Sequence, residues 1–182
     1  MSVSRLALPL LATTLSLACT PSEPPRWAQG GAQLVLPAAR WQRGDDDDIE
    51  IKPNGYVYED GDLVFVIDRV GRVVDENFDP VAIMFPDGTV VGTDQYGYGH
   101  VGITNASPPD RTTAWLAITP DGGVIFFEAD GERLPGGKWQ GCAGAGQRTC
   151  TLVTHMIAIR NYVRQSDTGM SVGVGVGVGV GY

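Results

Sequence analysis

Positive charge is scarce in this sequence. It has 13 Lys and Arg residues against 21 Asp and Glu residues, which gives a formal net charge of −8. A chain with this charge repels a phosphate backbone unless a local basic patch overrides the field of the whole molecule. We therefore expect no nucleic-acid partner. The 182 residues, 43% of them hydrophobic, suit one globular domain and are too apolar for wholesale disorder.

Residues that carry common catalytic and metal chemistry are also scarce. The chain has two histidines, His100 and His155, and no G-x-S-x-G sequence that would mark a serine nucleophile. Cys142 and Cys150 do not stand with these histidines at a common zinc spacing. The acidic run GDDDDIE at 44–50 lacks the alternation and the glycine of an EF-hand loop. We assign no catalytic residue, no metal site and no cofactor, and a hydrolase that uses His100 or His155 is the alternative.

The first residues have the layout of an export signal. A single positive charge at Arg5 precedes an uncharged apolar run, residues 6–17, and small residues follow it. As a helix this run would span about 18 Å, against roughly 30 Å for the hydrocarbon core of a bilayer, so it is too short for an ordinary transmembrane helix. We expect residues 1–18 to be a signal peptide.

The stretch LSLAC, which ends at Cys19, resembles the lipobox of bacterial lipoproteins. It departs from that family's pattern at Ser16, where leucine is preferred, and the resemblance covers residues 1–19 only. It implies a lipid on Cys19 and hence a membrane partner reached through the anchor. Thr20 is not the aspartate associated with inner-membrane retention in some bacteria, so the resemblance further implies the outer membrane. An ordinary secretory signal is the alternative.

The cysteine count is odd, since Cys19, Cys142 and Cys150 are the three cysteines of the chain. If Cys19 carries lipid, the other two are free to pair in the oxidising environment of an exported protein. The residues between them, AGAGQRT, are mostly small and allow a short closed loop. The sequence therefore predicts a disulfide between Cys142 and Cys150.

From residue 49 onward, apolar runs alternate with turns centred on Pro, Asn, Asp or Gly, as in IEIKPNGYVY and AIMFPDGTVV. The turn glycines Gly55, Gly71, Gly88 and Gly122 lie 16, 17 and 34 residues apart, with one degenerate unit near 103–110. This spacing is too short for propeller blades. It predicts a mainly β fold, a compact antiparallel hairpin meander that forms a small sandwich or barrel over 45–182. Residues 19–44 are expected to be a tether, and the alternative is that Trp27 and Trp41, with LVLP at 34–37 between them, dock as a first short strand.

The C-terminal part is ambiguous between helix and strand. Leu152, Met156, Ile159 and Val163 recur at helical spacing, which favours a helix near 152–165, and a long terminal hairpin is the close alternative. The Val-Gly alternation after Met170 predicts a paired strand with its valines in the core. A terminal strand of this kind also resembles the last strand of outer-membrane barrels, which gives a further alternative for the function.

The stretch DQYGYGHVG places Tyr96, Tyr98 and His100 at period two, so an extended chain would put the three rings on one face. Such rings could stack on sugars, and a packed sheet face is the structural alternative. We therefore expect an exported cell-envelope lipoprotein that acts as a non-catalytic binding or structural module. Its partner would be a cell-wall glycan or an envelope protein.

Overall fold

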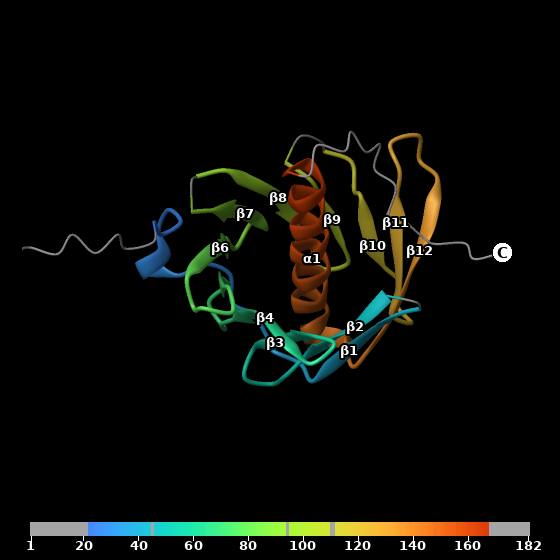
Figure 1. Ribbon diagram of the computed structural model, residues 1–182, viewed down its shortest axis with the longest axis horizontal. Helices are drawn as coiled ribbons and strands as arrows, with labels where there is room; N and C mark the ends of the chain where they lie inside the picture. The colour runs from blue at the N-terminus through green and yellow to red at the C-terminus, as the bar shows by residue number, and fades with distance from the viewer. Residues whose placement is uncertain (1–21, 45, 94, 110–111, 168–182) are drawn as a thin grey trace, which may run out of the picture.

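The computed structural model describes residues 22–44, 46–93, 95–109 and 112–167. Within them, twelve antiparallel strands form a closed barrel in which consecutive strands pair and the first strand pairs with the last (Figure 1). The strands are β1 (Ala39–Arg43), β2 (Asp46–Ile51), β3 (Tyr56–Glu59), β4 (Asp62–Ile67), β5 (Arg72–Val74), β6 (Pro80–Met84), β7 (Thr89–Gly92), β8 (Gly97–Val101), β9 (Asn105–Ser107), β10 (Leu116–Ile118), β11 (Gly123–Phe127) and β12 (Arg133–Gln140). Short 3-10 turns lie at η1 (Trp27–Gln29) and η2 (Gly144–Gly146), and one helix follows, α1 (Gln147–Asp167). The predicted hairpin meander and C-terminal helix are confirmed, and the closed barrel is the form they take.

A left-handed glycine gives the turns their period. At the β6–β7 turn, Gly88 has φ 99°, and its carbonyl accepts the amide N–H of Val101 from β8 at 2.8 Å. A Cβ on Gly88 would stand 2.5 Å from the carbonyl oxygen of Val101, so a side chain would block this approach. The same bond links further turns to later strands: Gly55 to Ile67, Gly71 to Met84 and Gly122 to Trp139. Each unit of about 17 residues is thus one pair of strands plus one of these bonds.

The degenerate unit near 103–110 has the same kind of bond from its turn to a later strand, although no left-handed glycine occupies this turn. The carbonyl of Thr104, in the turn between β8 and β9, accepts the N–H of Ile118 at 2.7 Å. The turn here is short, and its backbone reaches β10 without a residue in the left-handed region. Glycine is therefore needed only where the turn itself requires a positive φ.

Strand β1 closes the barrel. Its Trp41 lies opposite Trp139 of β12, and the two rings stack with centroids 5.6 Å apart. Both side chains are buried. Upstream of β1, Ala32 is buried as well, and its N–H donates to the carbonyl of Met84. The structure therefore places residues 39–43 in the barrel and residues near 32 against it, rather than in the tether that the sequence suggested for 19–44.

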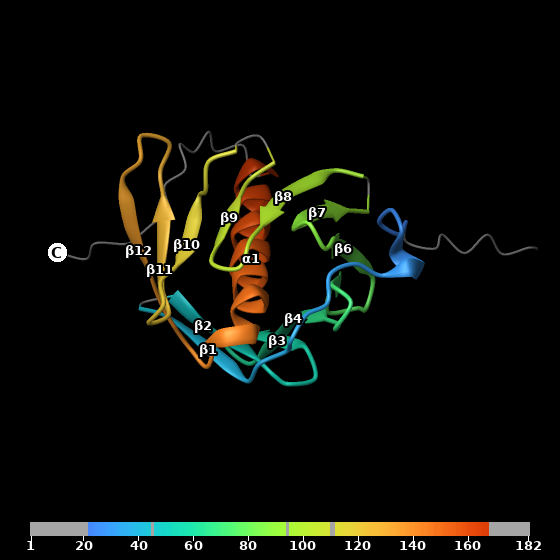
Figure 2. The same ribbon diagram turned by 180° about the vertical axis from the view of Figure 1, so that it is seen from behind.

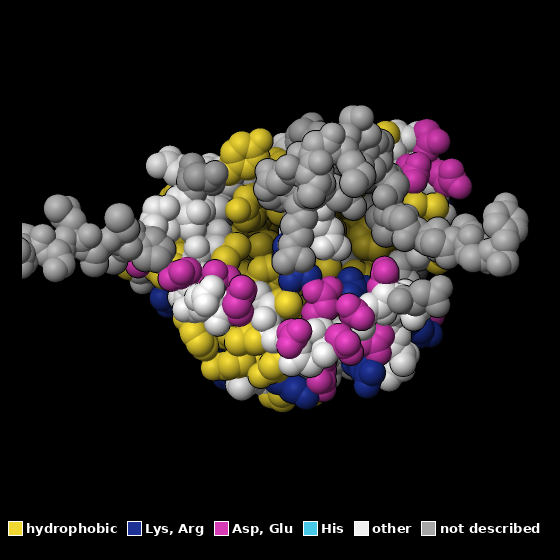
Figure 3. Space-filling view, viewed as in Figure 1, with side chains coloured by type: hydrophobic (Ala, Val, Ile, Leu, Met, Phe, Trp, Pro, Cys, Tyr) yellow, Lys and Arg dark blue, Asp and Glu magenta, His cyan; other side chains and the backbone are white. Residues whose placement is uncertain are grey.

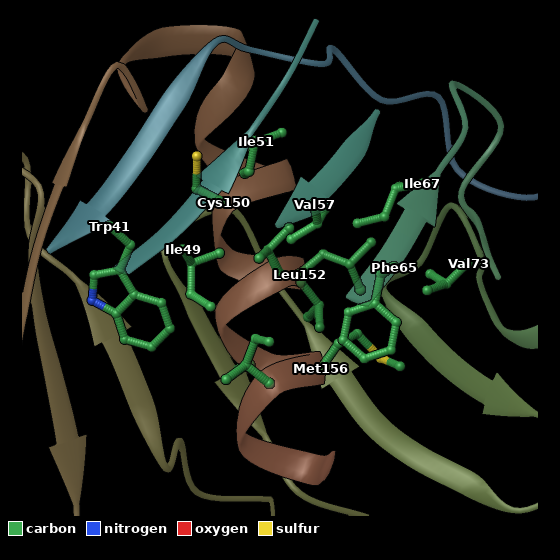
Figure 4. Close-up of a cluster of buried hydrophobic side chains, with 14 of the residues drawn as sticks. Trp41, Ile49, Ile51, Val57, Phe65, Ile67, Val73, Cys150, Leu152 and Met156 are labelled. Carbon is green, nitrogen blue, oxygen red and sulfur yellow. The ribbon is translucent and has the colours of Figure 1, made fainter. Parts of the chain in front are cut away.

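Helix α1 fills the interior of the barrel. Figures 1 and 2 show it running between the strands when the molecule is seen from the front and from behind. Residues 149–157 are buried without a break, so the helix has no solvent face along this stretch. Apolar side chains from several strands point at it, among them Ile49, Val57 and Phe65, which surround Leu152 and Met156 (Figure 4). The core of the protein is this helix and the inward faces of the strands.

The buried threonines of α1 have hydrogen-bond partners. Thr149 and Thr151 donate to the carbonyls of Val35 and Ile103, both at 2.7 Å. The hydroxyl of Thr154 donates to the carbonyl of Cys150 one turn earlier and accepts the indole N–H of Trp139. Because each hydroxyl is hydrogen-bonded, threonine can stand inside the barrel without a large desolvation cost.

The predicted disulfide between Cys142 and Cys150 is present. It joins the segment that leaves β12 to the first turn of α1, with the two Cα atoms 6.1 Å apart. Both cysteines are buried. The bridge therefore fastens the internal helix to the barrel wall at the point where the chain enters the interior.

Ion pairs connect the second half of α1 to the barrel wall. Arg160 of α1 and Arg43 of β1 both donate to the carboxylate of Glu59 on β3, the second at 2.7 Å. Burial alone raises the pKa of Glu59, but the hydrogen bonds and charges of Arg160 and Arg43 outweigh it and the net effect lowers that pKa. One carboxylate thus links two strands and the helix.

Some predictions fall on residues that the structure does not describe. The lipid-bearing Cys19 and the Val-Gly strand after Met170 both lie outside the described residues. Within the described ranges, no helix combines the length and the hydropathy needed to cross a bilayer.

Candidate ligand-binding surface

The three rings predicted to share one face differ in their exposure in the structure. Tyr96 precedes β8 and is 64% exposed. Tyr98 is half-buried and packs against the core, with its ring carbon Cζ 2.8 Å from the position of a Cβ on Gly92. His100 is exposed. A register shift in the pairing of β7 with β8 interrupts the alternation that would have aligned these side chains.

His155 is a buried, fully partnered core residue. Its Nδ1 accepts the indole N–H of Trp115 at 3.0 Å, and its Nε2 lies 2.6 Å from the carbonyl of Tyr98, to which it donates. Burial lowers the pKa of His155 to about 4, against the weaker opposite effect of the Tyr98 carbonyl. The ring is therefore neutral at pH 7 and holds α1 to β8 and to the loop before β10.

His100 lies at a cleft of about 420 Å³ whose wall includes the hydroxyl residues Thr89, Ser107 and Thr112. Its Nε2 is 2.6 Å from the backbone carbonyl of Asp87. In the described part of the chain, His100 makes no hydrogen bond to a side-chain hydroxyl or carboxylate. The backbone N–H of Thr89, and to a smaller extent the nearby His100, lower the pKa of Asp87. The nucleophile–base–acid arrangement of a hydrolase is not assembled among these residues.

A second cleft, of about 290 Å³, opens beside the disulfide. Thr119 and Lys138 each hydrogen-bond the carboxylate of Asp121, at 2.6 and 3.1 Å, and lower the pKa of Asp121 to about 2. These polar groups already satisfy one another. The arrangement links the β10–β11 turn to β12, and these three side chains bond to one another.

The structure gathers another set of rings that the sequence analysis did not single out. Tyr56 and Tyr58 of β3 stack with centroids 6.3 Å apart and planes inclined by 23°. The ring of Phe78, from the β5–β6 turn, meets Tyr56 edge-on at 6.3 Å and 70°. Phe78 is 57% exposed and the two tyrosines are partly exposed. We call Tyr56, Tyr58 and Phe78 the aromatic platform.

The alternation of β3 and the pairing of its neighbours create this platform. Val57 is fully buried, so Tyr56 and Tyr58 on either side of it point outward. Across the sheet, Tyr56 pairs with Val66, and Val66 pairs with Val74. Both valines are only partly buried. The outer face of β3–β5 is thus apolar next to the rings.

Phe78 is held in place by its turn. The Asp75 carboxylate accepts the N–H groups of Asn77 and Asp79, both at 2.9 Å, and the Asp75 carbonyl accepts the N–H of Phe78. Phe78 has φ 65°, in the left-handed region that bulky residues rarely adopt. The Asp75 N–H also donates to the carbonyl of Asp79. The β11–β12 turn has the equivalent backbone bonds, from the N–H of Glu128 to the carbonyl of Glu132 and from the N–H of Gly131 to the carbonyl of Glu128, with Gly131 in the place of Phe78. The backbone alone would favour glycine at residue 78.

Acidic side chains border the platform. Glu76 and Asp79 flank Phe78 and are exposed. Neither forms an ion pair with a Lys or Arg among the residues that the structure places. Figure 3 shows apolar side chains gathered at the lower left of the molecule, over β3 and β4, with acidic side chains along their upper edge. At the other border Lys52 pairs with Glu50, which lies opposite Tyr58, at 2.5 Å.

Comparisons with protein-family models, with curated proteins and with solved structures found no match for this chain. A sequence signal for the platform did exist, because YVY at 56–58 has the same period two as the stretch that drew attention at 96–100. The arrival of Phe78 beside Tyr56 depends on the pairing of β3 through β6 and has no local signal.

The carboxylates of Glu128, Asp130 and Glu132 come within 4.8 Å of one another in the β11–β12 turn. The Asp130 carboxylate accepts the N–H of Glu132 at 2.9 Å and so shapes the turn. Asp130 and Glu132 are exposed. Exposed acidic turns of this kind are common, and this one supports no metal assignment.

Proposed function

We propose that this protein is an exported lipoprotein of the bacterial cell envelope, anchored through Cys19, that binds a glycan without catalysis at the aromatic platform. The observation that carries the glycan proposal is one outer face on which three partly exposed rings adjoin one another. The C–H face of a sugar ring is apolar and flat, so it gains by covering aromatic rings, while its hydroxyls stay in water or bond to polar groups at the border. Exposed aromatic surface of this kind on a folded domain is typical of a binding site.

The rigidity of the barrel supports the proposal. Strand β3 is paired on both sides, and the inward-facing Val57 between the tyrosines is fully buried. The Phe78 turn is closed by several hydrogen bonds to Asp75. Rings held in this way lose little conformational freedom when a ligand covers them.

Export and anchoring rest on the sequence features of residues 1–20. Intact-mass analysis of the protein purified from bacterial membranes tests them: a mature chain that begins at Cys19 and carries the mass of the lipid is the expected result. An unmodified Cys19, or cleavage at another residue, would contradict the anchor.

Glycan binding is tested by isothermal titration with a hexamer of N-acetylglucosamine. Tyr58→Ala and Phe78→Ala should each weaken binding about tenfold, because each removes stacking worth roughly 1 to 2 kcal/mol. Tyr96→Ala is the matched control, since it also removes an exposed tyrosine but lies outside the platform. Loss of binding in Tyr96→Ala with no loss in the platform variants would move the site to β8.

An envelope hydrolase that uses His100 is the second candidate function. The observation that favours it is the cleft in which His100 lies near Thr89 and Ser107. Incubation with the same hexamer, followed by chromatography for shorter sugars, tests it. Cleavage that is lost in His100→Ala would replace the non-catalytic proposal.

A further inference from the structure

The charge at the border of the aromatic platform points to the class of sugar that it binds. We infer that the platform selects sugar units that carry a free, protonated amine, such as glucosamine, over their N-acetylated counterparts. This inference rests on the glycan-binding function proposed above. It goes further in assigning Glu76 and Asp79 as the residues that determine specificity.

The first step is the position of these two carboxylates. Glu76 and Asp79 stand two residues before and one residue after Phe78, in a turn whose backbone is fixed by Asp75. Both side chains are exposed. A ligand that covers the ring of Phe78 must therefore approach two negative charges that no Lys or Arg of the described chain neutralises by an ion pair.

The ammonium group of Lys52, at the other border of the platform, is already paired. Lys52 adjoins β3, since its N–H donates to the carbonyl of Tyr56. Its ammonium group is paired with Glu50. The pair contributes no net charge, whereas the unpaired Glu76 and Asp79 give the border beside Phe78 a negative charge. A net charge of −8 on the whole chain acts in the same direction.

The third step is the chemistry of the ligand. Glucosamine and N-acetylglucosamine present similar ring faces for stacking, so the rings alone distinguish them weakly. The free amine adds an ammonium group that can bond a carboxylate and can also approach an aromatic face. Exposed ion pairs are individually weak, and two of them correspond to roughly fivefold tighter binding. Acetylation removes the charge and with it this gain.

The test compares two probes with the full purified chain kept in detergent: a β-1,4-linked hexamer of glucosamine and the matching hexamer of N-acetylglucosamine. Titration calorimetry at pH 6 and low salt should give a dissociation constant about fivefold lower for the amine-bearing hexamer. The preference should shrink as salt is added, because exposed charges are screened. The double variant Glu76→Gln, Asp79→Asn should bind both hexamers equally.

A matched control separates specific contacts from general acidity. The double variant Glu128→Gln, Glu132→Gln also removes two negative charges, but from the β11–β12 turn. That turn has similar backbone bonds and has Gly131 in place of Phe78. This variant should keep the preference. A preference that survives in Glu76→Gln, Asp79→Asn, or that falls equally in both double variants, would overturn the assignment of these carboxylates.

The outcomes also distinguish the two proposals. Equal binding of the two hexamers by the unmodified protein would overturn the amine selectivity and leave glycan binding intact. Binding of neither hexamer would overturn both. Each double variant is first checked by circular dichroism and thermal melting, so that a loss of binding is not caused by unfolding.

Discussion

Replacing Phe78 by glycine and by alanine tests both the platform and the backbone that presents it. Phe78 is 57% exposed, so somewhat less than half of its surface is covered. A fully buried aromatic side chain covers about 200 Å², so the covered part here is about 85 Å² and contributes about 2 kcal/mol to folding as an upper estimate. Both substitutions lose most of this contribution.

The two substitutions differ in the backbone. An L-residue at φ 65° carries a left-handed strain of about 1 to 2 kcal/mol, which alanine keeps and glycine removes. Glycine in turn adds about 0.5 to 1 kcal/mol of unfolded-state entropy. We therefore expect Phe78→Ala to lower the free energy of unfolding by about 2 kcal/mol and Phe78→Gly by about 1 kcal/mol. The usual order, in which alanine is the more stable, is reversed.

Urea unfolding followed by tryptophan fluorescence measures both values. Ile103 provides the control, since it is 63% exposed and has no positive φ, and there Ile103→Gly should be less stable than Ile103→Ala. If glycine is the less stable residue at 78 as well, the left-handed backbone of Phe78 is not strained and the reasoning fails. If Phe78→Gly folds and binds the hexamer as tightly as the unmodified protein, the ring is not part of the site.

Three further predictions concern the interior. Reduction of the bridge between Cys142 and Cys150 should lower the free energy of unfolding by about 2.5 kcal/mol, from the loop that it closes, and a thermal melt with and without reductant that shows no difference would contradict this. The pKa of His155 is lowered from 6.5 to about 4 in the folded state, so the unfolded chain binds the proton more readily. The contribution of the neutral His155 ring to the free energy of unfolding is therefore full above pH 6.5 and is lost as the pH falls toward 4. Urea titrations at several pH values should show a smaller loss over this interval in His155→Gln, and equal slopes for the two proteins would refute the assignment. Glu59→Gln leaves Arg43 and Arg160 without their shared carboxylate and should cost about 2 to 4 kcal/mol in the same assay, whereas an unchanged value would mean that the pairing does not fasten the helix.

The hairpins could be predicted because their signals are local. A turn such as PDG at 86–88 is recognisable from its residue types, and the strands on either side are short and rich in β-branched residues. The disulfide followed from the cysteine count, and the helix near 152–165 from the spacing of Leu152 and Met156. Each of these features depends on a few neighbouring residues.

The role of the helix could not be predicted in the same way. A stripe of apolar residues at helical spacing indicates one buried face, and the threonines and His155 between them would ordinarily face water. Here they are buried too, because strands far away in sequence surround the helix and supply partners such as Trp115 and Trp139. The same non-local closure brings β1 into the barrel, where the composition of residues 19–44 had suggested a tether.

The candidate site shows the limit of period-two reasoning. The pairing has a register shift in both places. In the β3–β4 pairing the extra residue is Val64 on β4, so β3 keeps its alternation and the two tyrosines point outward together. In the β7–β8 pairing the extra residue is Tyr98 itself, which packs against the core while His100 stays exposed. Period two in the sequence does not show which strand will hold the extra residue.

The filled interior determines where a ligand can bind. A barrel can hold a small molecule inside when its inward side chains leave a cavity, but here α1 occupies that space and its residues 149–157 are buried without a break. Two clefts of the described chain, beside the disulfide and beside His100, lie near the ends of strands, and internal hydrogen bonds cross the first of them. The proposed glycan site therefore uses outward-facing residues. The aromatic platform combines apolar surface, fixed geometry and unpaired charge, so substitutions there should change the proposed recognition while the helix-filled core keeps the fold.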